Sequence, residues 1–458
     1  MRNFFRFHNE AEKPDTAHRL YEKIAKLPIY DYHCHLSPKE IWEDAPIDNI
    51  GALWLGHDHY KWRLMRQFGI DEHYITGDAS WEEKFCKYAM AVSLAAGNPL
   101  YHWTKMELEM YFGITEELTA DNAKDIFRRA NDVIAAKALS PRKLIELSGV
   151  RYIATTDDII DTLEYHQKLA AQATLCATVA PSFRTDNLLQ VNRPDYLTYL
   201  ERLSAVSGVA VTDLETLKQA VCSRLDYFCQ NGCKFTDVGI EYFPRIVGSA
   251  EEAQEAFERV LAGETLSAID YSLFLGHMFV FLGCEYAKRN LVMQIHLAVK
   301  RNANSMLYQA LGADAGGDCM GDAIPGDAII AVLDQINTAT GLPRTILYSM
   351  NASMCTQLAT IAGSFPRVNV GTAWWMCDHK RGIAEQIRVI AEVGHLATFY
   401  GMLTDSRSFT SYARHDYFRR ILCDVMAEWV DKDGFPEATA LVLLERICFL
   451  NTKNLIEQ

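Results

Sequence analysis

The stretch Pro28-Ile29-Tyr30-Asp31-Tyr32-His33-Cys34-His35 has the β-branched and aromatic composition of a strand. A proline begins it, and the turn-forming pair Ser37-Pro38 follows it. Residues two apart in a strand point to the same side, so His33 and His35 should face one way and Cys34 the other. The sequence therefore predicts a short buried strand that ends in two histidines with a shared orientation.

Seven further apolar runs follow along the chain, each separated from the next by a segment long enough for a helix. They cover residues 152–156, 174–181, 233–240, 291–297, 345–350, 367–374 and 397–403. Alternating strands and helices are typical of a parallel sheet, and eight such units predict an α/β fold of the (β/α)8 TIM-barrel type. The alternative, an open doubly wound sheet, lacks its usual G-x-G-x-x-G fingerprint here.

The interval 36–150, between the first two strand runs, is far longer than the others and has helical periodicity at 81–94 and 121–138. We predict that 36–150 is a helical insertion. Because it follows a strand, it should leave from the C-terminal face of the barrel and cover the active site there. No linker or repeat interrupts the rest, so residues 1–458 are expected to form a single domain.

The composition is that of a soluble globular chain, with 458 residues of which 49% are hydrophobic. Forty-five basic and 59 acidic residues give a net charge of −14, which disfavours nucleic acid and anionic membranes as partners. We expect a small-molecule substrate, and the composition leaves open whether the protein is a homo-oligomer.

The twelve cysteines lack CxxC pairs and are expected to be free thiols in a reducing, cytoplasmic setting. The N-terminal MRNFFRFHNEAEKPD turns acidic before an apolar signal stretch develops. The most apolar internal run, 271–287, is interrupted by His277 and Glu285. We therefore expect neither an export signal nor a membrane span.

A metal site is predicted where the first and eighth strand runs meet. Neutral imidazoles of His33 and His35 at the end of a barrel strand suit zinc or another transition metal. Asp405 follows the eighth run, which adjoins the first on closure, so it can reach the same ion or act as a base. The alternatives are a hydrogen-bonded pair of buried histidines and a helix N-cap at Asp405. His296, which closes the run 291–297, is a candidate for a further ligand or a substrate donor.

Three arginines, Arg184, Arg301 and Arg407, follow predicted strand ends. Convergence of guanidinium groups in so acidic a chain indicates a carboxylate or phosphate in the substrate. Tyr60, in the insertion, is a candidate proton carrier or a packing residue on a helix face.

Two other stretches lie near predicted strand ends. Trp374 and Trp375 end the seventh run, and alternation predicts that only one of the two indoles lines the site. The glycine-rich stretch 314–319 lacks the spacing of a calcium loop and is expected to be a βα loop.

Several motifs together resemble the uronate (glucuronate) isomerase family of the amidohydrolase superfamily, over nearly the whole chain from about residue 28 to the C-terminal ICFLN. The motifs are DYHCHL (31–36), GDAS (77–80), GNPLYHW (97–103), TTDD (155–158), GCK (232–234), WWMCD (374–378) and GMLTDSRSF (401–409). The resemblance implies interconversion of D-glucuronate with D-fructuronate and of D-galacturonate with D-tagaturonate. It implies metal ligation by His33, His35 and Asp405, and a substrate site lined by His59, Tyr60, Arg184, Asp237, His296, Arg301, Trp374 and Arg407.

This chain departs from the binuclear amidohydrolases at its sixth strand run, which ends in Ser349-Met350-Asn351 without a histidine. We therefore expect one divalent metal ion, zinc by preference, rather than two.

An aldose–ketose conversion through an enediolate moves a proton between C2 and C1, which needs a base, a proton carrier and a cation beside the oxygens. Asp405 and Tyr60 are the predicted proton-transfer groups, with His59 next, and the arginines would hold the C6 carboxylate. A direct hydride shift is the alternative route. The alternative functions are a metal-dependent amidohydrolase or deaminase, and a non-catalytic binding barrel.

Overall fold

The first strand, β1 (Ile29–Asp31), begins directly after Pro28, as predicted, and the chain leaves the sheet before His33. The structure is a computed structural model that describes residues 15–172 and 174–457. The predicted absence of an export signal concerns the N-terminal stretch, of which residues 1–14 lie outside the described residues.

The later strands pair in parallel with their neighbours along the chain, in the orders β1-β2-β4 and β11-β10-β7-β6-β5-β3. Strand β3 follows β2 after two residues, and β5 follows β4 after one residue, so the two sheets continue into each other. Pro181 separates β4 from β5 because it has no N–H to donate to a ladder. The strands are β2 (Val150–Ala154), β3 (Asp157–Asp158), β4 (Thr178–Ala180), β5 (Ser182–Arg184), β6 (Phe235–Val238), β7 (Val292–Leu297), β10 (Arg344–Ser349) and β11 (Val368–Val370).

The predicted eighth strand at 397–403 is wrong. This segment forms the short helix η5 (Leu396–Thr398) and then an irregular stretch, in which Gly401 has a φ of +69°. A Cβ on Gly401 would lie 2.3 Å from the carbonyl oxygen of Ile447, so the close approach also requires glycine. Side chains donate hydrogen bonds to the carbonyl oxygens of this segment. For example, Asn451 Nδ2 donates to the carbonyl oxygen of Phe399 at 2.8 Å. These carbonyls therefore do not join a strand ladder.

The irregular stretch nevertheless fills the eighth place in the barrel. On one side, the amide of Asp405 donates to the carbonyl oxygen of His33 at 3.1 Å. On the other side, Asn369 Nδ2 lies 3.2 Å from Thr398 Oγ1. The α/β barrel is thus closed between β11 and β1 by backbone and side-chain hydrogen bonds rather than by a regular strand.

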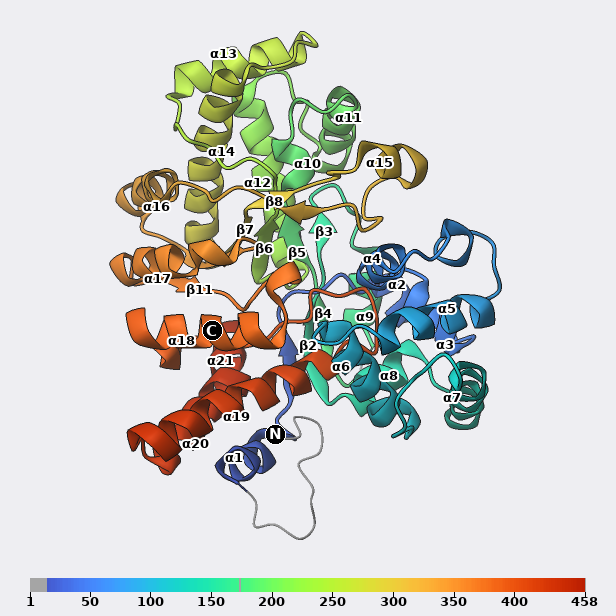
Figure 1. Cartoon of the computed structure of the whole chain (residues 1–458). Coiled ribbons are helices and arrows are strands. Elements are labelled where there is room, and N and C mark those ends of the chain that lie inside the picture. Colours follow the sequence, from blue (N-terminus) through green and yellow to red (C-terminus); the bar gives the residue numbers. More distant parts are fainter. Residues whose placement is uncertain (1–14, 173, 458) are drawn as a thin grey trace.

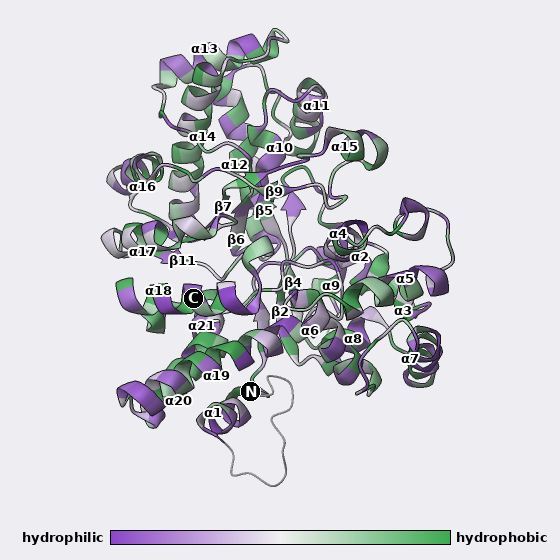
Figure 2. Ribbon diagram, in the orientation of Figure 1, coloured by the Kyte–Doolittle hydropathy of each residue, from purple (hydrophilic) through white to green (hydrophobic). Residues whose placement is uncertain are grey.

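Long helices cover the outside of the strands, and helices that are successive in the chain pack side by side, as α17 does on α18 and α18 on α19 (Figure 1). Hydrophilic and hydrophobic residues alternate along outer helices such as α13 and α19 (Figure 2), as expected for helices with one face on a core. The helices outside the insertion are α1 (Thr16–Ile24), α9 (Glu164–Ala170), α10 (Asp186–Leu189), α11 (Tyr196–Ser207), α12 (Leu214–Gln230), α13 (Ala250–Leu261), α14 (Ala268–Lys288), α15 (Ser305–Leu311), α16 (Gly326–Thr340), η3 (Ala352–Met354), α17 (Cys355–Ser364), η4 (Trp375–Cys377), α18 (Lys380–Val393), α19 (Ala413–Asp433), α20 (Glu437–Glu445), η6 (Arg446–Leu450) and α21 (Asn451–Glu457).

The apolar core has an inner and an outer part. Tyr32, Phe235 and Tyr348 belong to the inner cluster, and Cys34 belongs to the large outer one. Cys34 therefore faces the outer layer, as predicted, but Tyr32, two residues before it, faces the inner one, because the regular strand ends at Asp31. All twelve cysteines are free thiols, also as predicted.

Helix α14 is long and apolar enough, by length and composition alone, to cross a membrane. It packs against α13, α16 and β7, and 56% of its most apolar window is buried inside the protein. That burial is typical of a core helix in a globular barrel.

The interval between β1 and β2, which the structure describes in full, contains helices joined by loops and no strand, and its blue-to-teal helices gather on one side of the strands (Figure 1). A capping box formed by Ser80 and Glu83 begins the first of its predicted helical stretches. Its elements are α2 (Pro38–Glu43), α3 (Ile50–Leu55), α4 (His59–Gln67), η1 (Glu72–Tyr74), α5 (Trp81–Ser93), α6 (Pro99–Glu107), η2 (Leu108–Phe112), α7 (Ala123–Lys137) and α8 (Pro141–Leu147).

A second connection leaves the barrel after β7. It contains the antiparallel pair β8 (Val299–Lys300) and β9 (Cys319–Met320), with α15 between them. Arg63 of α4 donates to the carbonyl oxygen of Asp318 at 2.6 Å, which joins this connection to the helices that follow β1.

Candidate active site

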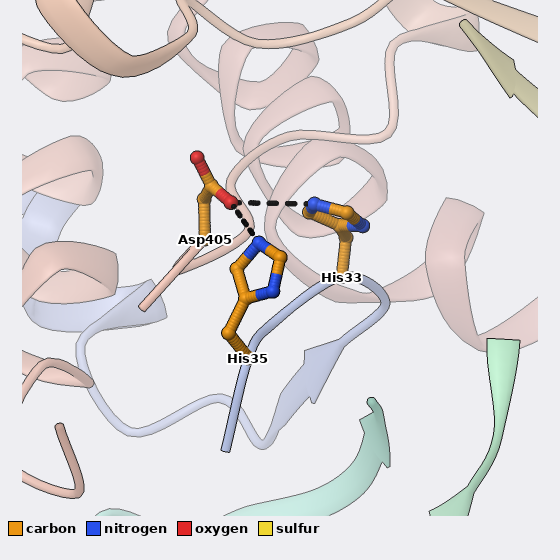
Figure 3. Close-up of side chains that lie close together, drawn as sticks. All are labelled: His33, His35 and Asp405. Carbon is orange, nitrogen blue, oxygen red and sulfur yellow. Dashed lines mark ion pairs between the residues drawn. The ribbon is translucent and has the colours of Figure 1, made fainter. Parts of the chain in front are cut away.

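Figure 3 shows His33, His35 and Asp405 pointing toward one another. The two histidines follow β1, and Asp405 follows the irregular stretch beside it. Oδ1 of Asp405 lies 3.3 Å from Nε2 of His33 and 3.0 Å from Nε2 of His35. The three side chains offer ligand atoms within 4.8 Å of one another, a spacing suited to one metal ion.

The hydrogen bonds of His35 indicate which of its nitrogens carries a proton. The Thr156 hydroxyl donates to the carbonyl oxygen of Cys34 at 2.7 Å, so it accepts from Nδ1 of His35 at 2.6 Å. Burial lowers the pKa of His35 to about 4, which keeps the ring neutral at pH 7. The lone pair of Nε2 therefore faces the Asp405 carboxylate, an arrangement that favours a cation between the two.

Asp405 is held in a strained conformation with a φ of +45°. The preceding residue, Thr404, is fixed by its amide, which donates to Oδ1 of Asp31 at 2.9 Å. Trp374 Nε1 donates to the second carboxylate oxygen of Asp405 at 2.9 Å. Burial alone would raise the pKa of Asp405, but the neighbouring imidazoles of His33 and His35 hold it well below its usual value. Asp405 is thus an oriented, ionised carboxylate.

His296, at the end of β7, forms a second buried group with Asp237 of β6. Its Nδ1 lies 2.8 Å from Oδ1 of Asp237, and its Nε2 is buried without a hydrogen-bond partner. The His296 ring is 4.8 Å from the ring of His33. Burial lowers the pKa of His296, so Nδ1 donates to the carboxylate and Nε2 presents a lone pair. That lone pair can bind a cation or accept a proton from a substrate hydroxyl.

Two carboxylates, Asp237 and Asp405, act on His33 from its two sides. Burial lowers the pKa of His33, but the charges of Asp237 and Asp405 outweigh it and the net direction is upward. The pocket around His33 therefore favours positive charge, whether as a proton or as a metal ion.

These groups line one cavity of about 640 Å³ at the carboxyl ends of the strands. Ten of the eleven residues predicted for the site line this cavity. They are His33, His35, His59, Arg184, Asp237, His296, Arg301, Trp374, Asp405 and Arg407.

Tyr60 is the predicted site residue that does not line the cavity. It lies one residue along α4 from His59, with its ring stacked on that imidazole at 5.0 Å. Its ring is also 6.2 Å from that of Trp375. Burial raises the pKa of Tyr60 well above its usual value, so the phenol is protonated at neutral pH.

Each predicted arginine also forms an ion pair with an acid close to the cavity. Arg184 pairs with Asp186 at 3.0 Å, Arg301 with Asp318 at 3.0 Å, and Arg407 with Asp314 at 2.8 Å. The sequence analysis did not assign these three acids to the site. Asp314 and Asp318 lie in the glycine-rich loop 314–319. The only sequence feature that could have placed them near the site is the position of this loop after a predicted strand.

Arg407 also orients His59. Its Nη1 lies 3.2 Å from Nδ1 of His59, and a guanidinium can only donate. Nδ1 of His59 is therefore the acceptor, and the proton of the neutral ring is on Nε2. Burial, followed by the charge of Arg407, lowers the pKa of His59 and maintains this neutral form.

The expectation that one of the two adjacent indoles lines the site is wrong, since both Trp374 and Trp375 line the cavity. Strand β11 ends at Val370, before the pair, and Trp375 adopts a φ of +50°. Strand alternation therefore no longer applies at these residues. The guanidinium of Arg301 lies over the Trp375 ring, 5.2 Å from the ring centroid, which is a cation–π contact.

Comparisons with known proteins identify the family of the chain. The family model of glucuronate isomerase matches residues 1–456. A uronate isomerase from Caldanaerobacter subterraneus subsp. tengcongensis is 43% identical over 448 residues, which are 96% of each chain. The crystal structure of a uronate isomerase from Thermotoga maritima has a TM-score of 0.92 at 29% identity, covering 96% of this chain and 97% of that one. That of a glucuronate isomerase from Caulobacter crescentus has a TM-score of 0.91 at 25% identity, covering 99% and 97%. The resemblance found in the sequence is confirmed, and the chain belongs to the glucuronate isomerase family.

Proposed function

We propose that the protein is an aldose–ketose isomerase of hexuronates, which interconverts D-glucuronate with D-fructuronate and D-galacturonate with D-tagaturonate. The observation that carries this proposal is the convergence of three guanidinium groups on the cavity that holds His33, His35 and Asp405. Arginines suit the carboxylate of a uronate, and the cluster suits its sugar oxygens. Family membership favours this function over a hydrolase or deaminase.

We propose that His33, His35 and Asp405 hold one divalent ion, with zinc as our choice. The facing lone pair of His35 Nε2 and the Asp405 carboxylate support this fit, as does the buried, unpartnered Nε2 of His296. A bound divalent ion would act as a Lewis acid beside the sugar oxygens. His296 is the candidate for a further ligand or for a contact to a substrate hydroxyl.

The side chains of this chain would carry the proton between C2 and C1. Asp405 is ionised and faces the cavity, so it is our first candidate for the base at C2. His59 also faces the cavity, with its Nε2 proton available as an acid. Tyr60 lies behind His59 and retains its phenolic proton, so we propose it as the proton carrier of the cycle.

The three arginines and Trp374 would bind and orient the substrate. Arg184, Arg301 and Arg407 would share the C6 carboxylate in place of part of their present contacts to Asp186, Asp318 and Asp314. Trp374 would fix the carboxylate of Asp405 through its indole N–H. Asp237 would keep the proton of His296 on Nδ1.

We further propose that 36–150 is an elaboration of a single domain and that it shields the cavity from water. The contact of Arg63 with the connection after β7 supports this arrangement. A cytoplasmic location stays a prediction from the cysteine content.

The function is tested by incubating the protein with D-glucuronate or D-galacturonate in deuterated water and following the products by NMR. We expect the corresponding keto acid, with deuterium at C1 in part of the product after repeated turnover. A keto acid that never gains solvent deuterium would favour a hydride shift. Absence of any keto acid from either uronate, with the protein folded and zinc supplied, would contradict the proposed function.

Arg407→Met should lower kcat/KM for D-glucuronate by about 30-fold or more, because removal of a charge-assisted pair costs about 2–5 kcal/mol. The lower end of this free-energy range applies, because the Arg407 side chain is 31% exposed to solvent. Steady-state kinetics with Arg381→Met, an exposed arginine of α18, as a control measures the effect. Equal kcat/KM in the two variants would remove Arg407 from carboxylate binding.

A further inference from the structure

Arg414 of α19 is an unusual arginine, because its side chain is buried with only 2% exposed. Nη1 donates to the carbonyl oxygen of Thr404 at 2.8 Å, while Nε has no hydrogen-bond partner. Within the described part of the chain, no carboxylate oxygen lies close enough to form an ion pair with it. Asp58, Glu107 and Asp378 act on its charge from further away. A buried guanidinium of this kind needs a reason other than an ion pair.

The guanidinium cation of Arg414 lies over two aromatic rings, which are inclined to each other at 66°. Its central carbon lies 4.1 Å from the ring centroid of Trp103 and 5.1 Å from that of Tyr60. Trp103 belongs to α6 and Tyr60 to α4, so both rings come from the region between β1 and β2. Attraction between a cation and a ring face is strongest where water is excluded, as it is here.

The edge of the same guanidinium contacts the segment that presents Asp405. The carbonyl of Thr404 belongs to the peptide bond that precedes Asp405, and Asp405 has the strained φ of +45°. A strained residue keeps its conformation only when neighbouring groups hold it. Arg414 is therefore one of the groups that fix the direction of the Asp405 carboxylate.

We propose that Arg414 is a positioning residue for the isomerisation. One rigid guanidinium contacts the Tyr60 ring and donates to the carbonyl oxygen of Thr404, and so fixes the two proton-transfer groups relative to each other. A lysine ammonium lacks the rigid, planar fork of a guanidinium and cannot keep both contacts in the same geometry. This inference rests on the roles proposed above for Tyr60 and Asp405.

The main test is Arg414→Lys, with steady-state kinetics on D-glucuronate. A misplacement of catalytic groups can cost about 100-fold in rate, so we expect kcat to fall by about that factor while KM changes by less than about threefold. The matched control is Arg419→Lys. Arg419 lies on the same helix, is 4% exposed, and donates to the carbonyl oxygens of Ala25 and Leu27 at 3.0 and 2.8 Å. The Arg419→Lys variant should lose thermal stability but keep the kcat of the parent.

Combination with Tyr60→Phe separates this inference from the proposed function. If Arg414 acts through Tyr60, Arg414→Lys should cost less in the Tyr60→Phe background than in the parent. A reduced kcat in Arg414→Lys with parental kcat in Tyr60→Phe would reject the role of Tyr60 and support action through Asp405. A reduced kcat in Tyr60→Phe with parental kcat in Arg414→Lys would overturn the inference and leave the proposed function standing.

Trp103→Phe covers the case in which Arg414→Lys fails to fold. It keeps an aromatic residue under the guanidinium but weakens the contact, so we expect a several-fold lower kcat at unchanged KM. Parental kcat in Trp103→Phe, or equal kcat in the lysine variants of Arg414 and Arg419, would show that Arg414 has only a structural role.

Discussion

Asp405→Asn is expected to lower kcat by about 10³–10⁴-fold, because one substitution removes both the predicted base and a charged metal ligand. An amide has nearly the same size, and its oxygen can still accept from Trp374 Nε1, so the fold should survive. Steady-state kinetics on both uronates and elemental analysis of the purified protein measure the two effects. We expect substoichiometric metal as well as low activity.

Asp416→Asn is the matched control for this variant. Asp416 lies on α19, and its side chain is 14% exposed, as is that of Asp405. It pairs with Arg420 at 2.8 Å, away from the cavity. The control should lose some thermal stability and keep its kcat and metal content. Parental kcat and full metal content in Asp405→Asn would remove Asp405 from both proposed roles.

Tyr60→Phe is expected to lower kcat by about 10²–10⁴-fold with little change in KM, the effect of losing a proton carrier from the cycle. Phenylalanine keeps the stack on His59 and the ring face under Arg414, so the local packing should persist. Steady-state kinetics with D-glucuronate checks the expectation.

The control for Tyr60 is Tyr88→Phe, which removes the phenol of a buried tyrosine of α5 that bonds Thr104 at 2.6 Å. It should unfold at a lower temperature and retain its kcat. If Tyr60→Phe behaves in the same way, Tyr60 is a packing residue, and His59 becomes the next candidate for the carrier.

The fold could be predicted where short-range patterns determine it. The β1 stretch has a proline before it, β-branched residues within it and two-residue alternation along it, and all three signals are local. The predicted eighth strand failed because Asn451 and Thr452, about fifty residues further on, bind its carbonyl oxygens. No pattern within 397–403 could reveal these partners.

The candidate site could also be predicted only in part. Strand alternation predicted a shared orientation of His33 and His35, and the two side chains do point toward the same carboxylate although the regular strand ends at Asp31. The indole of Trp375 could not be placed, since its φ of +50° depends on the turn that follows β11. The position of Tyr60 behind His59, rather than in the cavity wall, depends on how the helices between β1 and β2 pack on the barrel.

The closure of the barrel by the segment around Thr404 has a consequence for the order of events during protein synthesis. Thr404 hydrogen-bonds to Asp31, a residue 373 positions earlier. The carbonyl oxygens just before it are held by Asn451 and Thr452. When the ribosome has made β1 to β11, the barrel is therefore still open beside β1. Only two of the three proposed metal ligands, His33 and His35, have then been made. Contacts between such distant residues form slowly. The proposed site is therefore expected to be complete only after residue 452 has been made and the barrel has closed beside β1.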